Sequence, residues 1–470
     1  MPRFFIEQYG SAVNGLVSSI TQFLSIISFL EMGVGAVIQS SLYKPLAEKD
    51  IDGISAVHIA SGKFFRKIAC ILAIYVCVLL AVYPFAINSE FNWLFTALLI
   101  LAISISMFAQ YCFGLADLIL LTADQRGYIA CSSQIATLIL NTIACIGLMK
   151  LGAPIHVVKL TTSIIYLARP IIIRLYINSY YQIKRNIKFQ DDPIKHKWDA
   201  VTQHIAHIVL NNTDILVLTS FSTLTNVSIY SIYYMVVHGI KTLFLYVTNG
   251  IQPAVGEMWA RDESEKLNRF FEIVEFTLHT VIVLIFTVTA ILIVPFISVY
   301  TKDVADVDYT QPLFATILVV AHAFHCLRNP YHILIKAAGH FKQTSKCYVI
   351  AAVMNVVLSV VTVYKFGLVG VAIGTLVAMT YQTVWMAVYS SKNIVKIPIK
   401  KFIWQCTVDV ICVALIVLST CWLKLNTMTF LGWTILAIEV FGIAAIVTVI
   451  VNVVFCRKKL NAVLGFLKSK

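Results

Sequence analysis

FLGWTILAIEVFGIAAIVTVIVNVVFC, residues 430–456, is an apolar run in which Glu439 is the only charged side chain. A helix of about 20 such residues crosses a hydrocarbon core about 30 Å thick. Comparable runs recur along all 470 residues of the chain, which is 59% hydrophobic and only 13% charged. A single water-soluble core does not grow this large, and the strict alternation of a membrane barrel is absent. The sequence therefore predicts an all-α polytopic membrane protein.

About 13 membrane-crossing helices are predicted from these runs. They cover residues 12–42, 66–88, 93–121, 128–149, 152–178, 201–222, 226–250, 271–299, 310–337, 343–364, 367–390, 402–423 and 430–456. No apolar stretch followed by a small-residue cleavage site opens the chain, so we expect no cleaved signal peptide.

The orientation in the membrane is predicted from the basic residues. Most of the 36 Lys and Arg residues lie in alternate loops and in the carboxyl-terminal tail. The opposite loops at 83–92 and 221–227 carry none, and the loop at 300–311 is net acidic. Because basic loops stay on the cytoplasmic side, we expect the carboxyl end to be cytoplasmic. The net charge of +13 is thus a topology signal and does not indicate nucleic-acid binding.

The remaining motifs argue against an enzyme. The sequence contains no phosphate-binding glycine loop, no HExxH motif and no nucleophile elbow. Its 11 cysteines form no CxxC pair. We expect those inside apolar runs to be buried small hydrophobic residues, without disulfide or zinc roles; they include Cys70, Cys77, Cys145, Cys347 and Cys412. The sequence therefore predicts no catalytic residue, no cofactor and no metal site.

A faint internal repeat suggests that the chain consists of two similar halves. The matched pairs, in order, are Asn14 with Asn226, Ser19 with Ser231, Ile20 with Ile232, Ala123 with Ala337, Asn141 with Asn355, and Gly152 with Gly367. Parallel repeats of this kind place a substrate path between two bundles. We expect a bundle over 1–179, a basic linker over 180–200, a second bundle over 201–390, and an extra helix pair with a basic tail over 391–470.

The repeat also predicts that the amino half lacks most of its first helix. The helix 201–222 precedes Asn226, whereas only about a dozen residues precede Asn14, too few to span a bilayer. A misassigned start codon, a truncated gene or a genuinely odd-numbered protein would each explain this.

Polar residues form stripes on several of the predicted helices. They are His204, His207, Asn211 and Asp214 on 201–222; Tyr234, His238, Lys241 and Thr248 on 226–250; and His322, His325, Asn329, His332 and Lys336, beside Arg328, on 310–337. Pro330 is expected to kink the last of these helices. Arg169, Glu31 and Asp117 lie within three further spans.

Ionisable groups in a membrane are costly and usually face a cavity or a partner. We expect these stripes to line a hydrated cationic lumen, in which Arg169, Lys241 and Arg328 bind a diphosphate. Glu31, Asp117 and Asp214 would carry a proton or sodium ion, or would neutralise those bases. The alternative for each residue is a polar contact between helices. The spacing of His204 with His207, and of His322 with His325, is compatible with zinc, but no third ligand lies nearby in the sequence.

Several of these segments resemble the bacterial polysaccharide-biosynthesis flippases of the multidrug/oligosaccharidyl-lipid/polysaccharide exporter superfamily. The resemblance lies in residues 9–24, in the sequence Glu31-Met-Gly-Val-Gly35, in residues 42–46, and in the runs 211–218 and 227–233. It covers nearly the whole chain and identifies a family rather than a cargo.

The resemblance implies two pseudo-symmetric six-helix bundles, with 402–456 as two extra helices. It further implies a flippase of the bacterial cytoplasmic membrane that moves an undecaprenyl-diphosphate-linked oligosaccharide by alternating access. The glycan would be an O-antigen, capsule or exopolysaccharide repeat unit. Proton or sodium would be the coupling ion, and a polysaccharide polymerase is a candidate partner. The alternatives are an ion-coupled multidrug antiporter, a flippase for peptidoglycan precursor, and an inactive truncated membrane protein.

Overall fold

The computed structural model describes residues 2–30, 32–86, 91–184, 201–395 and 397–468. Every regular element in these ranges is helical, which confirms the predicted all-α class. The chain divides into two compact units, Met1–Ile208 and Val209–Lys470.

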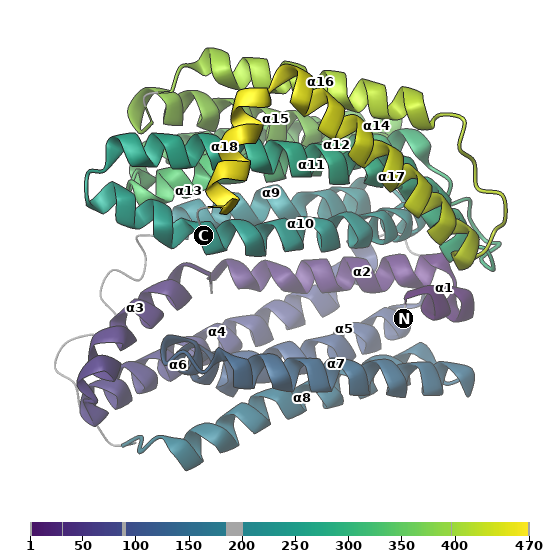
Figure 1. Ribbon diagram of the computed structural model, residues 1–470. Coiled ribbons are helices and arrows are strands. Elements are labelled where there is room, and N and C mark those ends of the chain that lie inside the picture. Colours follow the sequence, from purple (N-terminus) through teal and green to yellow (C-terminus); the bar gives the residue numbers. More distant parts are fainter. Residues whose placement is uncertain (1, 31, 87–90, 185–200, 396, 469–470) are drawn as a thin grey trace. The chain divides into compact units, whose positions relative to one another are not determined.

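The first unit consists of a series of helices with one 3₁₀ and one π-helical segment (Figure 1). They are α1 (Pro2–Tyr9), α2 (Ser11–Ser25), the 3₁₀ segment η1 (Ile26–Leu30), α3 (Met32–Glu48), α4 (Ile51–Ala86), α5 (Trp93–Ala109), the π-helical segment η2 (Gln110–Gly114), α6 (Leu115–Ala123), α7 (Gly127–Lys150) and α8 (Ile155–Tyr180). The span predicted at 12–42 is therefore not one continuous α-helix, because a 3₁₀ segment follows α2.

The helix α9 (Val201–Phe221) leads into the second unit (Figure 1). Its further helices are α10 (Leu224–Ala260), α11 (Ser264–Tyr300), α12 (Pro312–Leu327), α13 (Asn329–Ala337), α14 (Phe341–Phe366), α15 (Leu368–Asn393), α16 (Ile399–Thr420), α17 (Phe430–Phe455) and α18 (Arg457–Lys468). The kink predicted at Pro330 is confirmed, since the helix is interrupted at Arg328, between α12 and α13.

Ten helices of the described part are long and apolar enough to cross a membrane, and they correspond to ten of the predicted spans. The other three predicted spans correspond to α9, α10 and the pair α12–α13. Neither α12, with 16 residues, nor α13, with 9, is long enough alone. The three helical segments that carry the polar stripes are thus not among the ten found in the described part.

The two units share details of their local structure, as the internal repeat predicts. The hairpin α7–α8 turns near Gly152 and the hairpin α14–α15 turns at Gly367, and both glycines have positive φ angles, of 73° and 52°. Glycine reaches this region without a Cβ penalty. In each hairpin an asparagine of the first helix bonds the second helix: Asn141 contacts the Tyr166 hydroxyl at 3.4 Å, and Asn355 donates to Thr375 at 2.9 Å.

The helix before each hairpin is also interrupted in both units. In the first unit the π-helical segment η2 separates α5 from α6, and in the second unit Arg328 separates α12 from α13. The short helix after each interruption is anchored to the long helix before it. Asp117 of α6 contacts His58 of α4, and Tyr331 of α13 donates to Glu275 of α11. The two units are therefore pseudo-symmetric bundles, as predicted.

A GxxxG motif packs α15 closely against α14. A Cβ atom on Gly370 would lie 2.4 Å from the carbonyl oxygen of Thr362, and one on Gly374 would lie 2.8 Å from the backbone nitrogen of Ser359. Real Cβ atoms do not approach backbone this closely, so only glycine allows the contact. Small residues at such spacing are the usual means of close helix packing in membranes.

We predict that Gly374→Ala destabilises the protein by about 1–3 kcal/mol, the usual cost of an overpacked contact. The thermal unfolding midpoint in detergent measures this. Gly239→Ala in α10 is the matched control, because nothing lies within 4 Å of a Cβ built there. Equal midpoints for the two variants would contradict the close packing described here.

The predicted extra helix pair, α16 and α17, packs on α11 (Figure 1). The contact is mostly apolar, with Leu436 and Val440 of α17 buried against Leu292 of α11. Polar bonds add to it: Trp433 donates to the carbonyl of Leu292 at 3.2 Å, Asp409 of α16 lies 2.6 Å from the ring of His279, and Lys401 of α16 pairs with Glu272 of α11 at 2.5 Å.

The cysteine prediction is only partly correct. Cys145, Cys347 and Cys412 are buried, but Cys70 and Cys77 are exposed. They lie on a face of α4 that also exposes large apolar side chains, such as Ile74 at 66%. In a membrane protein lipid covers such a face, so apolar sequence alone does not distinguish interior from lipid contact.

Candidate functional site

A buried polar cluster in the second unit contains most of the site residues predicted there. Asp214 of α9 is 4% exposed and lies at one end of the cluster. Its Oδ2 accepts a hydrogen bond from the Tyr230 hydroxyl at 2.7 Å, and its Oδ1 accepts one from Thr375 at 2.7 Å. Asn355 donates in turn to Thr375, and the Oδ1 of Asn355 is buried without a hydrogen-bond partner among the described residues. This end of the cluster therefore gathers oxygen atoms around one carboxylate.

Two basic side chains occupy the rest of the cluster. Lys241 of α10 is 4% exposed, and its ammonium lies 6.0 Å from the centre of the Tyr234 ring. Arg328, at the interruption between α12 and α13, is 1% exposed. Its guanidinium donates to Gln382 of α15 and lies 3.5 Å from the Nε2 atom of His325. The hydrogen bonds that the structure gives to Arg328 thus reach an amide and an imidazole.

Histidine and tyrosine rings connect the Asp214 end of the cluster with the basic side chains at its other end. The Tyr234 ring lies 5.6 Å from that of Tyr230 and 5.5 Å from that of His322. His322 in turn lies 6.4 Å from His325. Both ring nitrogens of His322 are buried and have no hydrogen-bond partner within the described ranges. His238, by contrast, is an exposed residue beside Tyr234.

The local sequence explains why Arg328 reaches this position. Pro330 has no backbone N–H and cannot continue the hydrogen bonding of α12, so the helix breaks just before it. A break within a bundle turns side chains at that point toward the interior. The structure brings Asp214, Lys241, His322, His325 and Arg328, which the sequence placed on three separate stripes, into one cluster, and their role in binding stays a prediction.

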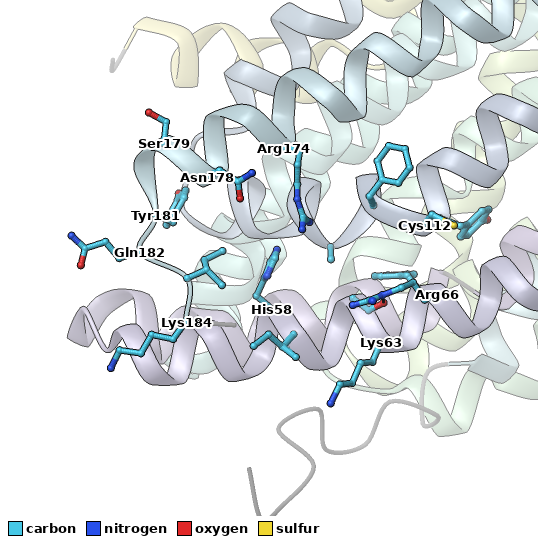
Figure 2. Close-up of a pocket in the computed structure, with 17 residues that line it drawn as sticks. His58, Lys63, Arg66, Cys112, Arg174, Asn178, Ser179, Tyr181, Gln182 and Lys184 are labelled. Atoms are coloured by element: carbon cyan, nitrogen blue, oxygen red, sulfur yellow. Dashed lines mark hydrogen bonds between the residues drawn. The ribbon is translucent and has the colours of Figure 1, made fainter. Parts of the chain in front are cut away.

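In the first unit Asp117 of α6 is completely buried and contacts two basic side chains. The Nε2 atom of His58 lies 2.7 Å from one carboxylate oxygen, and the Nη1 atom of Arg174 lies 3.3 Å from the other. Figure 2 shows His58 and Arg174 pointing toward each other from α4 and α8. Sequence reasoning missed both bases, because it began the helix of His58 at residue 66 and assigned no site role to Arg174, which lies within the span predicted at 152–178. The signal was present: 51–65 has no proline that would end a helix before the apolar run.

Arg169 of α8 is half-buried and lines a separate cavity of about 300 Å³. Gln110 and Tyr166 line the same cavity. Whether Arg169 and Asp117 act together with the cluster of the second unit stays a prediction.

Four predicted site residues, Glu31, His204, His207 and Asn211, have side chains outside the described residues. Within the described part, no group of three or more His, Cys, Asp or Glu is arranged to hold a metal ion.

Comparison with solved structures identifies the fold. The lipid II flippase MurJ, in an inward closed conformation, has a TM-score of 0.68 at 16% sequence identity, over 97% of this chain and 99% of that one. The chain has the fold of the MOP transporter superfamily. An inward-facing multidrug resistance MATE transporter of that superfamily has a TM-score of 0.61 at 13% identity, over 83% of this chain and 93% of that one. The MATE transporter VcmN of Vibrio cholerae, in its bent form, has a TM-score of 0.54 at 16% identity, over 83% of this chain and 96% of that one. No family model and no curated protein match the sequence.

Proposed function

We propose that the protein is a flippase for an oligosaccharide linked to a lipid diphosphate. The observation that carries this proposal is the burial of Lys241 and Arg328 in a bundle of the MOP fold. A buried base is costly unless an anion compensates it. Among the described residues, Arg328 has hydrogen bonds to Gln382 and His325. A diphosphate offers several anionic oxygens, for which a guanidinium fork is a suitable partner.

The cargo we favour is an undecaprenyl-diphosphate-linked repeat unit of O-antigen, capsule or exopolysaccharide. The similarity to a lipid II flippase supports a cargo with a lipid diphosphate. In this proposal the two bundles expose the binding residues alternately to the two sides of the membrane, and Arg169 of the first unit contributes a third base. The membrane is the bacterial cytoplasmic membrane, with the carboxyl end on its basic, cytoplasmic side.

Asp214 is the residue that we propose for ion coupling. Its carboxylate accepts from the Thr375 hydroxyl, to which the amide nitrogen of Asn355 donates, and the amide oxygen of Asn355 is buried without a partner among the described residues. Oxygen ligands suit a hard cation such as sodium, and the carboxylate alone would suffice for a proton. Binding of either ion would change the charge of the cluster, and with it the affinity for the anionic cargo.

Deleting the gene tests this function. We expect the lipid-linked oligosaccharide to accumulate on the cytoplasmic face and the surface glycan to disappear, with both effects reversed by a plasmid copy. The measurements are glycan display at the cell surface and extraction of lipid-linked precursors.

The second candidate is an ion-coupled multidrug antiporter, which the MATE structures favour. In that case deletion would raise sensitivity to cationic dyes and leave glycan display unchanged. A protein without transport activity would give neither phenotype.

A further inference from the structure

A large open cavity lies in the first unit. It has a volume of about 980 Å³ and lies between α4, η2 and α8, with the segment after α8 at its rim (Figure 2). This volume is typical of a ligand site. The proposed function assigns no role to the cavity.

The lining of this cavity is strongly basic. Lys63 and Arg66 of α4, Arg174 of α8 and Lys184 beyond it all line the cavity, and among the described residues no aspartate or glutamate does. Lys184 is held at the rim by an ion pair with Asp52, at 2.6 Å. Arg66 donates from its Nε atom to the carbonyl of Gly62 at 3.2 Å and also lines the cavity.

Arg174 is held loosely enough to change partner. Its Nη1 atom lies 3.3 and 3.4 Å from the oxygens of Asp117, longer than a good charge-assisted bond, and its side chain is 42% exposed. His58 lies closer to the same carboxylate, at 2.7 Å. If Arg174 turned toward an anion in the cavity, His58 would still contact the buried carboxylate of Asp117.

Neutral donors complete the lining. Asn178, Ser179, Tyr181 and Gln182 belong to the last turn of α8 and the segment after it. Partial burial, followed by the hydrogen bond to Asp124, raises the pKa of Tyr181, so its phenol remains neutral. A few polar groups of this kind fix the orientation of a ligand that charge attracts.

We propose that this cavity binds the phosphate group of a lipid headgroup, with Arg66 and Arg174 as its anion ligands. The two guanidinium groups come from different helices, so one phosphate can be held from two sides. The site is independent of Lys241 and Arg328 and does not require the proposed function. An anionic phospholipid and the diphosphate of a glycolipid share this chemistry.

Binding of phosphatidylglycerol to the purified full-length protein, measured by native mass spectrometry, tests the proposal. Phosphatidylcholine serves as the zwitterionic reference and inorganic pyrophosphate as a soluble competitor. We expect Arg66→Gln and Arg174→Gln each to weaken phosphatidylglycerol binding about tenfold, the effect of losing one charge-assisted hydrogen bond. Arg66→Gln leaves the buried contacts of Asp117 intact, so its effect cannot be ascribed to misfolding of that group.

Lys67→Gln is the matched control, because Lys67 is an exposed base on the same helix that does not line the cavity.

A second measurement uses Cys112, which does line the cavity. With Cys70, Cys77, Cys131 and Cys421 changed to Ser, a bound headgroup should slow the reaction of Cys112 with a thiol reagent. Competition by pyrophosphate would indicate a diphosphate ligand, and its absence an intact phospholipid. Normal binding by Arg66→Gln, or an equal loss in Lys67→Gln, would overturn the site.

Discussion

Transport should fall at least 100-fold when Arg328 is replaced by Met, even in a variant that folds as stably as the wild type. The reason is that Arg328 is 1% exposed, hydrogen bonded to an amide and an imidazole, and proposed to hold the diphosphate. Two charge-assisted hydrogen bonds to phosphate contribute about 3 kcal/mol or more, which corresponds to this factor. Flipping of a fluorescent lipid diphosphate in proteoliposomes measures it.

The double variant Arg328→Met/Gln382→Leu separates transport from folding. Arg328→Met alone leaves the Gln382 side chain buried without its partner, which costs about 1–3 kcal/mol. Removing both polar groups should restore the unfolding midpoint, because apolar replacements of buried polar pairs are often neutral or stabilising. Transport should remain lost. Arg269→Met, at an exposed arginine of α11, is the control for the loss of one positive charge. Transport restored together with stability would show that Arg328 is only a packing residue.

The fold was predictable because each membrane span is recognisable in the sequence as a long apolar run. A run such as 430–456 has too little charge to be anything but a membrane helix, and the structure places α17 there. Helix ends were predicted less well where a helix continues past the bilayer. Residues 51–65 and 224–260 are examples, since α4 and α10 are long helices with polar ends. Hydropathy detects the apolar part of such a helix and stops where charged residues begin.

The candidate site was predictable where it follows the period of one helix. His322 and His325, three residues apart, share a face of α12, and the break that Pro330 causes brings Arg328 beside them. Contacts between helices were not predictable. Nothing in the sequence indicates that Asp214 bonds Thr375, 161 positions away, or that Asp117 contacts both His58 and Arg174. Such pairs depend on which faces pack together, which one sequence does not encode locally.

Asp214→Asn should remove the dependence of transport on the ion gradient while leaving the fold intact. The amide has the shape of the carboxylate, and the hydroxyls of Tyr230 and Thr375 can rotate to accept as well as donate, so both hydrogen bonds can persist. The negative charge that would attract sodium or a proton is lost. We expect gradient-driven flipping to fall at least tenfold, to the rate seen without a gradient.

Proteoliposomes with an imposed sodium or pH gradient measure this effect, and the ion whose gradient stimulates the wild type is the coupling ion. Asp409→Asn is the matched control, because Asp409 is a carboxylate of the same unit that is also hydrogen bonded, to His279 and Gln405. It belongs to the contact of α16 with α11, so its loss should lower the unfolding midpoint and leave the response to the gradient unchanged. A response that survives in Asp214→Asn but disappears in Asp409→Asn would move the coupling site to the extra helix pair, because the charge that the ion needs would then lie there.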